Sequence, residues 1–301
     1  MDRTTEQGVS EQLEEGAGRI TLTRVGRFRR WIRRNPPGFA GLVLVTILVS
    51  MALSANIVAP YEPNDLVGLS NDMPSVEYPL GTDNIGRDIF SRLVHGARVS
   101  LVVGVSAVVF GMTGGLFLGL VSGYVGGWFD LIVQRIIDAM QAFPGIILAL
   151  TLVAVLGQSP QNVVIALAIG YIAPATRITR SVVLRERERV YAEAARALGA
   201  STPRVILKHV LPNSLAPYLV LVSIFVGLAI IAESSLSFLG AGVGPETSSW
   251  GSMLSVAAEN YFDATFTLAL APGLAITAAV MGFNLFSDSV RDMLDPRLRR
   301  R

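Results

Sequence analysis

The chain has 301 residues, of which 51% are apolar and only 16% are charged. A typical soluble domain has about 25% charged residues, so this composition excludes an ordinary soluble protein and indicates a membrane protein. The chain contains no cysteine, which excludes a disulfide framework and a thiolate metal site.

Residues 1–38 are predicted to form a cytoplasmic N-terminal arm. The first 18 residues are acidic, polar and free of aromatic residues, so we expect them to be disordered. Residues 24–38 are basic with Phe28 and Trp31 interleaved, which predicts a short interfacial helix on the anionic inner leaflet. This arm and the apolar run after it are too long for a cleaved signal peptide, so we expect a retained anchor.

Five stretches of the chain contain no charged residue. A helix needs about 20 residues to cross the hydrocarbon core, so each stretch can span the membrane at least once. The third stretch could be one tilted helix or two helices joined by the turn-forming sequence GQSPQN. The five stretches are 35–61, 99–129, 139–176, 209–232 and 264–287.

The distribution of basic residues favours two spans in the third stretch. With two spans there, 22 of the 25 Lys and Arg residues fall on one side of the membrane. Cytoplasmic segments carry such an excess, so both chain ends are expected in the cytoplasm. The basic side also explains the positive net charge of +2 without nucleic acid as a partner. The six predicted spans are 39–58, 101–121, 131–156, 163–178, 215–231 and 264–286.

Two segments are predicted outside the membrane. Residues 59–98 carry three arginines and six acidic residues, and Phe90 and Leu93 near their end predict a short amphipathic helix on the outer surface. Between spans five and six, residues 233–263 alternate Gly, Ser and Pro with apolar residues. This pattern predicts a re-entrant loop or short helices at the outer face.

Several residues at membrane depth need an interpretation. The glycines of span two predict close helix packing. Arg135 and Asp138 are spaced to pair with each other, which we favour over substrate contact. Glu233 could face the translocation path together with Ser234 and Ser235, or it could form hydrogen bonds within the outer turn.

Residues 181–213 form the most polar stretch between two spans. From Val190 to Leu198 the apolar residues recur with the period of a helix, and Gly199 predicts its end. Ser201 and the residues after it predict a second short helix that runs to Leu211, where Pro212 and the following asparagine redirect the chain. A solvated loop is the alternative, but two capped helices suit a rigid insert in the groove of a partner protein.

Three motifs carry a resemblance to a known family. The sequence EAARALG at 193–199, followed by Leu211 and Pro212, resembles the EAA loop of ABC importer permeases, with His209 where the general pattern has Ile. The stretches 79–101 and 233–254 resemble the C-type permease subunit of dipeptide, oligopeptide and nickel transporters.

This resemblance implies an all-α polytopic membrane protein with six transmembrane helices and a type I ABC importer permease core. The core would cover 99–290, after the first transmembrane helix at 39–58 and the outer segment 59–98, and would be followed by a basic tail at 291–301. The resemblance also implies that the 181–213 hairpin couples to an ATPase subunit. The coupling residues would be Glu193, Ala194, Ala195, Arg196, Gly199, Leu211 and Pro212.

The family likeness further implies partners and a location. They are a homologous B-type permease in a heterodimer, two ABC ATPase subunits and an extracytoplasmic substrate-binding protein, in the bacterial inner membrane. The chain itself has no Walker A motif, because its one lysine, Lys208, follows a leucine. We therefore expect no bound cofactor and no catalysis here, with ATP and Mg held by the ATPase subunits.

The expected substrate is a dipeptide or oligopeptide, with nickel or another small solute as the alternative. His95 and His209 fall on opposite faces of the membrane by this topology, so they cannot chelate one ion. A stand-alone secondary transporter would need coupling charges at the midplane, and an intramembrane enzyme would need paired acids or a Ser–His arrangement at depth. The sequence shows neither pattern.

Overall fold

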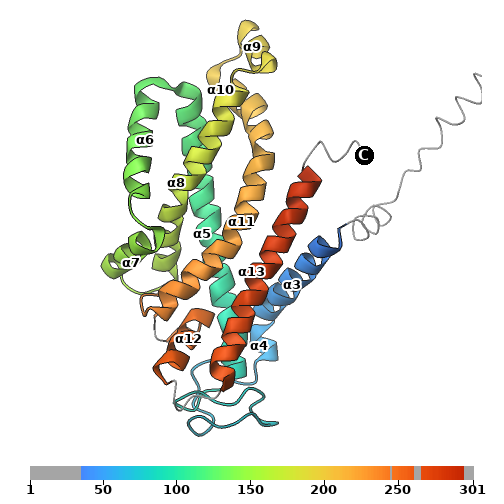
Figure 1. Cartoon of the computed structure of the whole chain (residues 1–301), viewed down its shortest axis with the longest axis vertical. Helices are drawn as coiled ribbons and strands as arrows, with labels where there is room; N and C mark the ends of the chain where they lie inside the picture. The colour runs from blue at the N-terminus through green and yellow to red at the C-terminus, as the bar shows by residue number, and fades with distance from the viewer. Residues whose placement is uncertain (1–34, 245, 261–265, 295–301) are drawn as a thin grey trace, which may run out of the picture.

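A computed structural model describes residues 35–244, 246–260 and 266–294. Within these ranges every regular secondary-structure element is a helix, apart from one isolated β-bridge between Thr82 and Asp88. The predicted all-α class is therefore confirmed (Figure 1). The predicted disordered start (1–18), most of the predicted interfacial helix (24–38) and most of the basic tail (291–301) lie outside the described residues.

Five helices are long and apolar enough to cross a membrane, and a bent pair makes a sixth span if it is counted as one. The predicted number of spans is reached on that count. The five are α3 (Pro36–Leu53), α5 (Ile89–Val125), α8 (Pro160–Glu186), α11 (Leu211–Phe238) and α13 (Phe266–Leu294), and the pair is α6 (Gly127–Gln141) with α7 (Gly145–Leu156).

The first span is shorter than the predicted range 39–58. Helix α3 ends at Leu53, and a separate turn, α4 (Ala55–Val58), follows it. Arg98 on α5 accounts for this stop, because its Nε donates to the Ala52 carbonyl at 3.1 Å and its Nη1 to Asn56 Oδ1 at 3.2 Å. The guanidinium thus satisfies acceptors that the end of a helix leaves open.

Helix α5 corrects the prediction of a separate helix on the outer surface. It is one continuous helix of 37 residues that starts at Ile89. Asp88 caps its start, since Oδ2 accepts from the Ser91 backbone N–H at 2.8 Å and from the Ser91 hydroxyl at 2.6 Å. At 1.5 Å per residue α5 is about 55 Å long, more than the roughly 30 Å hydrocarbon core requires. Its first turns therefore extend beyond the lipid.

The glycines of α5 allow α8 to approach its backbone closely, as predicted. A Cβ at Gly111 would lie 2.4 Å from the Ala168 carbonyl oxygen, and one at Gly115 would lie 2.4 Å from the Ala175 Cβ. At Gly119, two turns further along from Gly111, it would lie 2.6 Å from the Thr176 carbonyl oxygen. The three glycines are four residues apart, so they form one stripe along α5.

The third predicted span, 131–156, is not one helix. Helices α6 and α7 meet at 89° across Ala142–Pro144. Proline disfavours helical backbone in the residue before it, so a break at Pro144 is the expected result of this sequence. Figure 1 shows α6 running alongside α8, with α7 lying at a steep angle to α6.

Two ion pairs attach α6 to α8. Arg180 donates from Nε to Asp130 Oδ1 at 2.7 Å and from Nη2 to Oδ2, while Arg177 Nη2 lies 2.6 Å from Asp138 Oδ1. The predicted pair of Arg135 and Asp138 exists at 3.8 Å, but Arg177 is the closer partner of Asp138. These charges therefore join two helices and do not merely pair within one.

The described part of the segment between α11 and α13 contains the short helix α12 (Trp250–Glu259), as one of the predicted options allowed. Ser249 and Ser252 form a reciprocal capping box at its start. The buried Trp250 donates from Nε1 to the Leu93 carbonyl of α5 at 3.1 Å. Helix α12 is thereby fixed against the N-terminal end of α5.

The α5–α8 contact generates a stability prediction. Gly115→Ala places a methyl group within 2.4 Å of the Ala175 Cβ, so the two helices must separate. We expect a loss of about 1–3 kcal/mol in the free energy of unfolding, measured by denaturation in detergent. Gly170→Ala is the matched control, because a Cβ there meets nothing within 4 Å. Equal stability of the two variants would contradict the packing described here.

Candidate functional site

The segment between α8 and α11 begins with α9 (Val190–Ala197). Gly199 has a φ of +81°, the left-handed conformation that favours glycine. The Gly199 N–H donates to the Arg196 carbonyl at 2.9 Å, and the Ala200 N–H donates to the Ala195 carbonyl at 3.0 Å. These two bonds form a Schellman motif, so the predicted helix end at Gly199 is confirmed.

The second half of the hairpin differs from the prediction. Ser201 occupies the N-cap position, but its side chain makes no capping hydrogen bond to α10 (Thr202–Val205). Helix α10 continues through a π-helical turn, η1 (Ile206–Val210), directly into α11. The chain is not redirected at Pro212, which lies in the first turn of α11.

Helix α9 turns one face inward and one outward. Ala192 is fully buried in an apolar cluster of α5, α8, α10 and η1 side chains, and Tyr191 and Ala195 pack against this cluster. Val190 is 80% exposed and Leu198 is 89% exposed. The helix predicted from the apolar spacing over 190–198 is present, and its apolar residues divide between the buried cluster and the exposed surface, where Val190 and Leu198 lie.

The coupling residues divide between these two surfaces. Glu193, Ala194, Gly199 and Pro212 are exposed. Arg196 is also exposed, but its Nη2 donates to the Arg187 carbonyl at 2.9 Å and so holds α9 against the end of α8. Ala195 and Leu211 pack against the apolar cluster beneath the hairpin, together with Tyr191. The structure thus brings the predicted set together on one hairpin, which projects from one end of the helix bundle (Figure 1).

Tyr191 is a residue of the hairpin whose phenol is held by hydrogen bonds and whose pKa is raised. Its hydroxyl donates to Glu186 Oε2 at 2.6 Å and accepts from Asn213 Nδ2 at 3.3 Å. Burial first, and then the hydrogen bond and charge of Glu186, raise the pKa of Tyr191 to about 12. The phenol therefore remains protonated, and a donor, at neutral pH.

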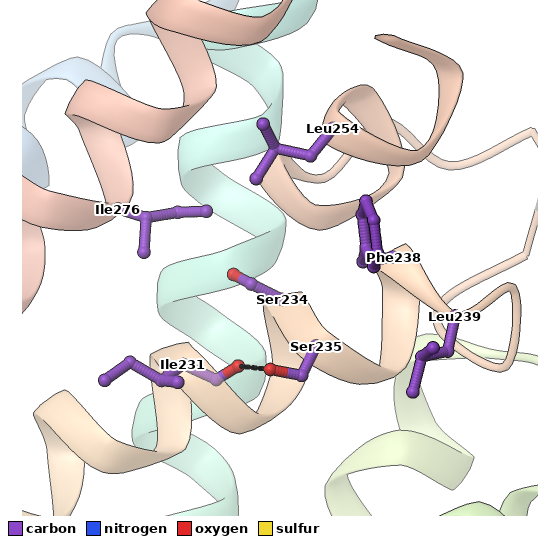
Figure 2. Close-up of a pocket in the computed structure, with 7 residues that line it drawn as sticks. All are labelled: Ile231, Ser234, Ser235, Phe238, Leu239, Leu254 and Ile276. Carbon is purple, nitrogen blue, oxygen red and sulfur yellow. Dashed lines mark hydrogen bonds between the residues drawn. The ribbon is translucent and has the colours of Figure 1, made fainter. Parts of the chain in front are cut away.

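A hollow of about 320 Å³ lies between α11, α12 and α13 (Figure 2). Ser234 and Ser235 line it, and the Ser235 hydroxyl donates to the Ile231 carbonyl at 2.8 Å. A second hollow, of about 460 Å³, shares Ile231 and Ile276 and extends along α13 to Asp288. The two hollows form a groove along α11 and α13 that is apolar for the most part, with polar side chains at intervals.

Glu233 lines neither hollow. It is fully buried, its Oε1 accepts from the Ser237 hydroxyl at 2.8 Å, and the Ser234 hydroxyl lies 3.4 Å from its Oε2. Glu233 therefore forms hydrogen bonds inside the protein, which is the second of the two interpretations given for it above. Of the three residues considered for the translocation path, only Ser234 and Ser235 lie at the groove.

The described ranges contain no group of three or more His, Asp or Glu side chains that could hold a metal ion. His95 lies in the second turn of α5, whereas His209 lies in η1, which packs near the opposite end of α5.

Sequence reasoning missed Tyr191 as a contact between helices. The signal in the sequence that could have identified it is the presence of Glu186 and Asn213, two polar residues at the ends of the hairpin that can hydrogen-bond to a phenol.

The cap of α9 generates a second prediction. Gly199→Ala meets no atom within 4 Å, so its cost comes from the left-handed backbone alone, about 1–2 kcal/mol. We expect faster hydrogen–deuterium exchange at the Ala200 amide. Gly199→Asn is the control, because asparagine tolerates this conformation better. Equal exchange in the alanine variant and the parent would show that the cap does not hold the hairpin.

Comparisons with known proteins agree with this architecture. Residues 115–300 match the family described as binding-protein-dependent transport system inner membrane component, and residues 23–75 match the N-terminal TM domain of oligopeptide transport permease C. The glutathione transport system permease protein GsiD of Pectobacterium atrosepticum is 40% identical over 274 residues, which are 90% of each chain. GsiD of Escherichia coli O157:H7 shows the same identity and coverage.

The dipeptide transport system permease protein DppC of Alkalihalophilus pseudofirmus is 41% identical over 271 residues, which are 89% of this chain and 88% of that protein. The two family models match 23–75 and 115–300, and these ranges include the hairpin and the groove described above. The chain therefore belongs to the inner-membrane permease family of binding-protein-dependent ABC transport systems.

Proposed function

We propose that this chain is the C-type permease subunit of an ATP-driven importer of short peptides and that α9 is its docking site for an ATPase subunit. The single observation that carries the proposal is the exposed, capped α9, which lies on a chain of this permease family. The relatives' names support the substrate class, since one names dipeptides and the other names glutathione, itself a small peptide.

The surface of α9 suits insertion into a protein groove. Val190 and Leu198 expose apolar side chains on a helix too polar to enter lipid, and Glu193 lies exposed between them in sequence. Exposed apolar residues at helical spacing are the usual anchors of a helix that binds in a groove. Closure of the ATPases would move α9, and through α8 and α11 it would move the spans between two orientations.

The groove along α11 and α13 is the proposed half of the translocation path. Its polar residues, Ser234, Ser235, Thr277, Asn284 and Asp288, are separated by aliphatic side chains. Such a wall has few fixed charges, which suits passage of peptides with different side chains. Selectivity would then reside in the extracytoplasmic binding protein, and the other half of the path in a B-type permease.

The orientation follows from the same proposal. The hairpin would lie in the cytoplasm, where the ATPases hold ATP and Mg, and α12 would lie outside, toward the binding protein. Both chain ends would be cytoplasmic, and the membrane would be the bacterial inner membrane. The basic residues between Arg177 and Lys208 support this orientation.

The substrate class is tested with the full complex in proteoliposomes. We expect ATP-dependent uptake of a labelled dipeptide or tripeptide in the presence of the binding protein that is encoded with this permease. The same vesicles should take up no nickel. Uptake of nickel without uptake of any peptide would contradict the proposal.

The docking role generates a variant prediction. Glu193→Arg should leave insertion and folding intact, because Glu193 is exposed, while it reverses the charge at the docking surface. We expect loss of peptide uptake and of ATPase co-purification, each by about tenfold or more. Glu188→Arg is the matched control, since Glu188 is an exposed carboxylate in the turn before α9. Normal uptake by Glu193→Arg would exclude α9 as the docking surface.

A further inference from the structure

Tyr191 contacts both helices that flank the hairpin. Its hydroxyl donates to Glu186 Oε2 at 2.6 Å, and Glu186 is the last residue of α8. The same oxygen accepts from Asn213 Nδ2 at 3.3 Å, and Asn213 lies in the first turn of α11. A single phenol oxygen therefore joins α8, α9 and α11.

The other side-chain hydrogen bond of α9, from Arg196, leads to the end of α8 and from there to α5. Arg196 donates to the Arg187 carbonyl at 2.9 Å, and Arg187 Nη1 donates to the Gly123 carbonyl of α5 at 3.0 Å. Among the described residues, the bond between Tyr191 and Asn213 is the only side-chain hydrogen bond from α9 to α11. The remaining contact on that side is apolar packing, which resists rotation of α9 less than a directed bond does.

Asn213 also joins this contact to the π-helical turn. Its Nδ2 donates to the His209 carbonyl at 2.7 Å, within η1. The His209 ring lies against the Tyr191 ring, with centroids 6.3 Å apart. A π turn is a common site of local adjustment in a helix, and here it lies between the hairpin and α11. A movement of α9 thus reaches α11 at this adjustable turn, through Tyr191 and Asn213.

Tyr191 can hold these bonds throughout the physiological pH range. Because the pKa of Tyr191 is raised to about 12, the hydroxyl keeps its proton and donates it to the Glu186 carboxylate. Hydrogen bonds to a charged partner are stronger than neutral ones. The link to α8 is therefore the firm one, and the longer link to α11 is the one that the π turn can relax.

We propose that Tyr191 is a positioning residue that fixes the angle of α9 to α8 and α11 together, so that it sets how much substrate is transported per ATP hydrolysed. This inference rests on the proposed docking of an ATPase at α9. With the hydroxyl present, a displacement of α9 moves both spans. Without it, only apolar packing and the chain through η1 connect α9 to α11, and ATP is hydrolysed without full movement of α11.

The test is Tyr191→Phe in the complete complex, with permeases, ATPases and binding protein in proteoliposomes. Phenylalanine keeps the ring against His209 and removes both hydrogen bonds. We expect the ATPase rate to stay within about twofold and peptide uptake to fall by about fivefold or more, so that the ATP-to-substrate ratio rises. Asn213→Ala, which keeps the Glu186 bond but removes the link to α11 together with the Asn213–His209 bond, should raise this ratio in the same way.

Tyr124→Phe is the matched control. Tyr124 packs against the same apolar cluster, and in the part of the chain that the structure describes its hydroxyl makes no side-chain hydrogen bond. Its ratio should equal that of the parent. An unchanged ratio in Tyr191→Phe, or a proportional fall of uptake and ATPase rate, would overturn the inference.

The outcome separates this inference from the proposed function. If the ATPase subunits do not co-purify with the parent protein, docking at α9 is wrong. If they do co-purify and Tyr191→Phe retains the parent ratio, docking stands and the positioning role is wrong. Normal coupling in Asn213→Ala beside uncoupled Tyr191→Phe would overturn the proposed link to α11.

Discussion

The close approach of α5 and α8 is the contact on which the rest of the structure depends. Glycines at 111, 115 and 119 remove the side chains that would hold the two backbones apart. In lipid, where association gains little from the hydrophobic effect, close packing of this kind is a main source of helix–helix stability. Because α8 is held along α5, its last turn at Glu186 occupies a defined place relative to the end of α5. The hairpin that follows is positioned by that geometry.

The hairpin combines a rigid body with an adjustable connection. The Schellman motif at Gly199 closes α9, and the cluster around Ala192 attaches it to the bundle. The π turn then leads into α11 without a break. At the end of α11 away from the hairpin, Gly251 of α12 packs against Ser234 of α11, and Trp250 of α12 donates to the Leu93 carbonyl of α5. Helix α11 is thus attached to α5 through α12 at that end, and it is joined to α9 through Tyr191 and Asn213 at the hairpin end. This asymmetry suits a helix that tilts about the end away from the hairpin when α9 moves.

Local signals in the sequence were sufficient for much of the fold and site. The charge-free runs, the glycine spacing of α5 and the stop at Gly199 each depend on residues near one another in the chain, and each prediction holds.

The failures involve contacts distant in sequence or a competing local signal. The apolar run around Pro144 predicts one continuous span, whereas this proline breaks the helix there. The choice of Arg177 as the partner of Asp138 depends on how α6 lies against α8, which no spacing rule within α6 contains. The apolar spacing predicts the helix at 190–198 but not which of its residues are exposed, because the exposure of Val190 and Leu198 depends on the rotation of α9 against the cluster beneath it.

The most direct test of the account is site-specific cross-linking from the tip of the hairpin. The chain contains no cysteine, so a single Leu198→Cys variant gives one defined attachment point, and Val76→Cys gives a fully exposed one in the segment between α4 and α5. The account predicts that a short thiol cross-linker joins residue 198 to an ATPase subunit in native membranes and that residue 76 forms no such product. Labelling of residue 198 by a membrane-impermeant maleimide in intact cells, or an ATPase cross-link from residue 76 alone, would contradict it.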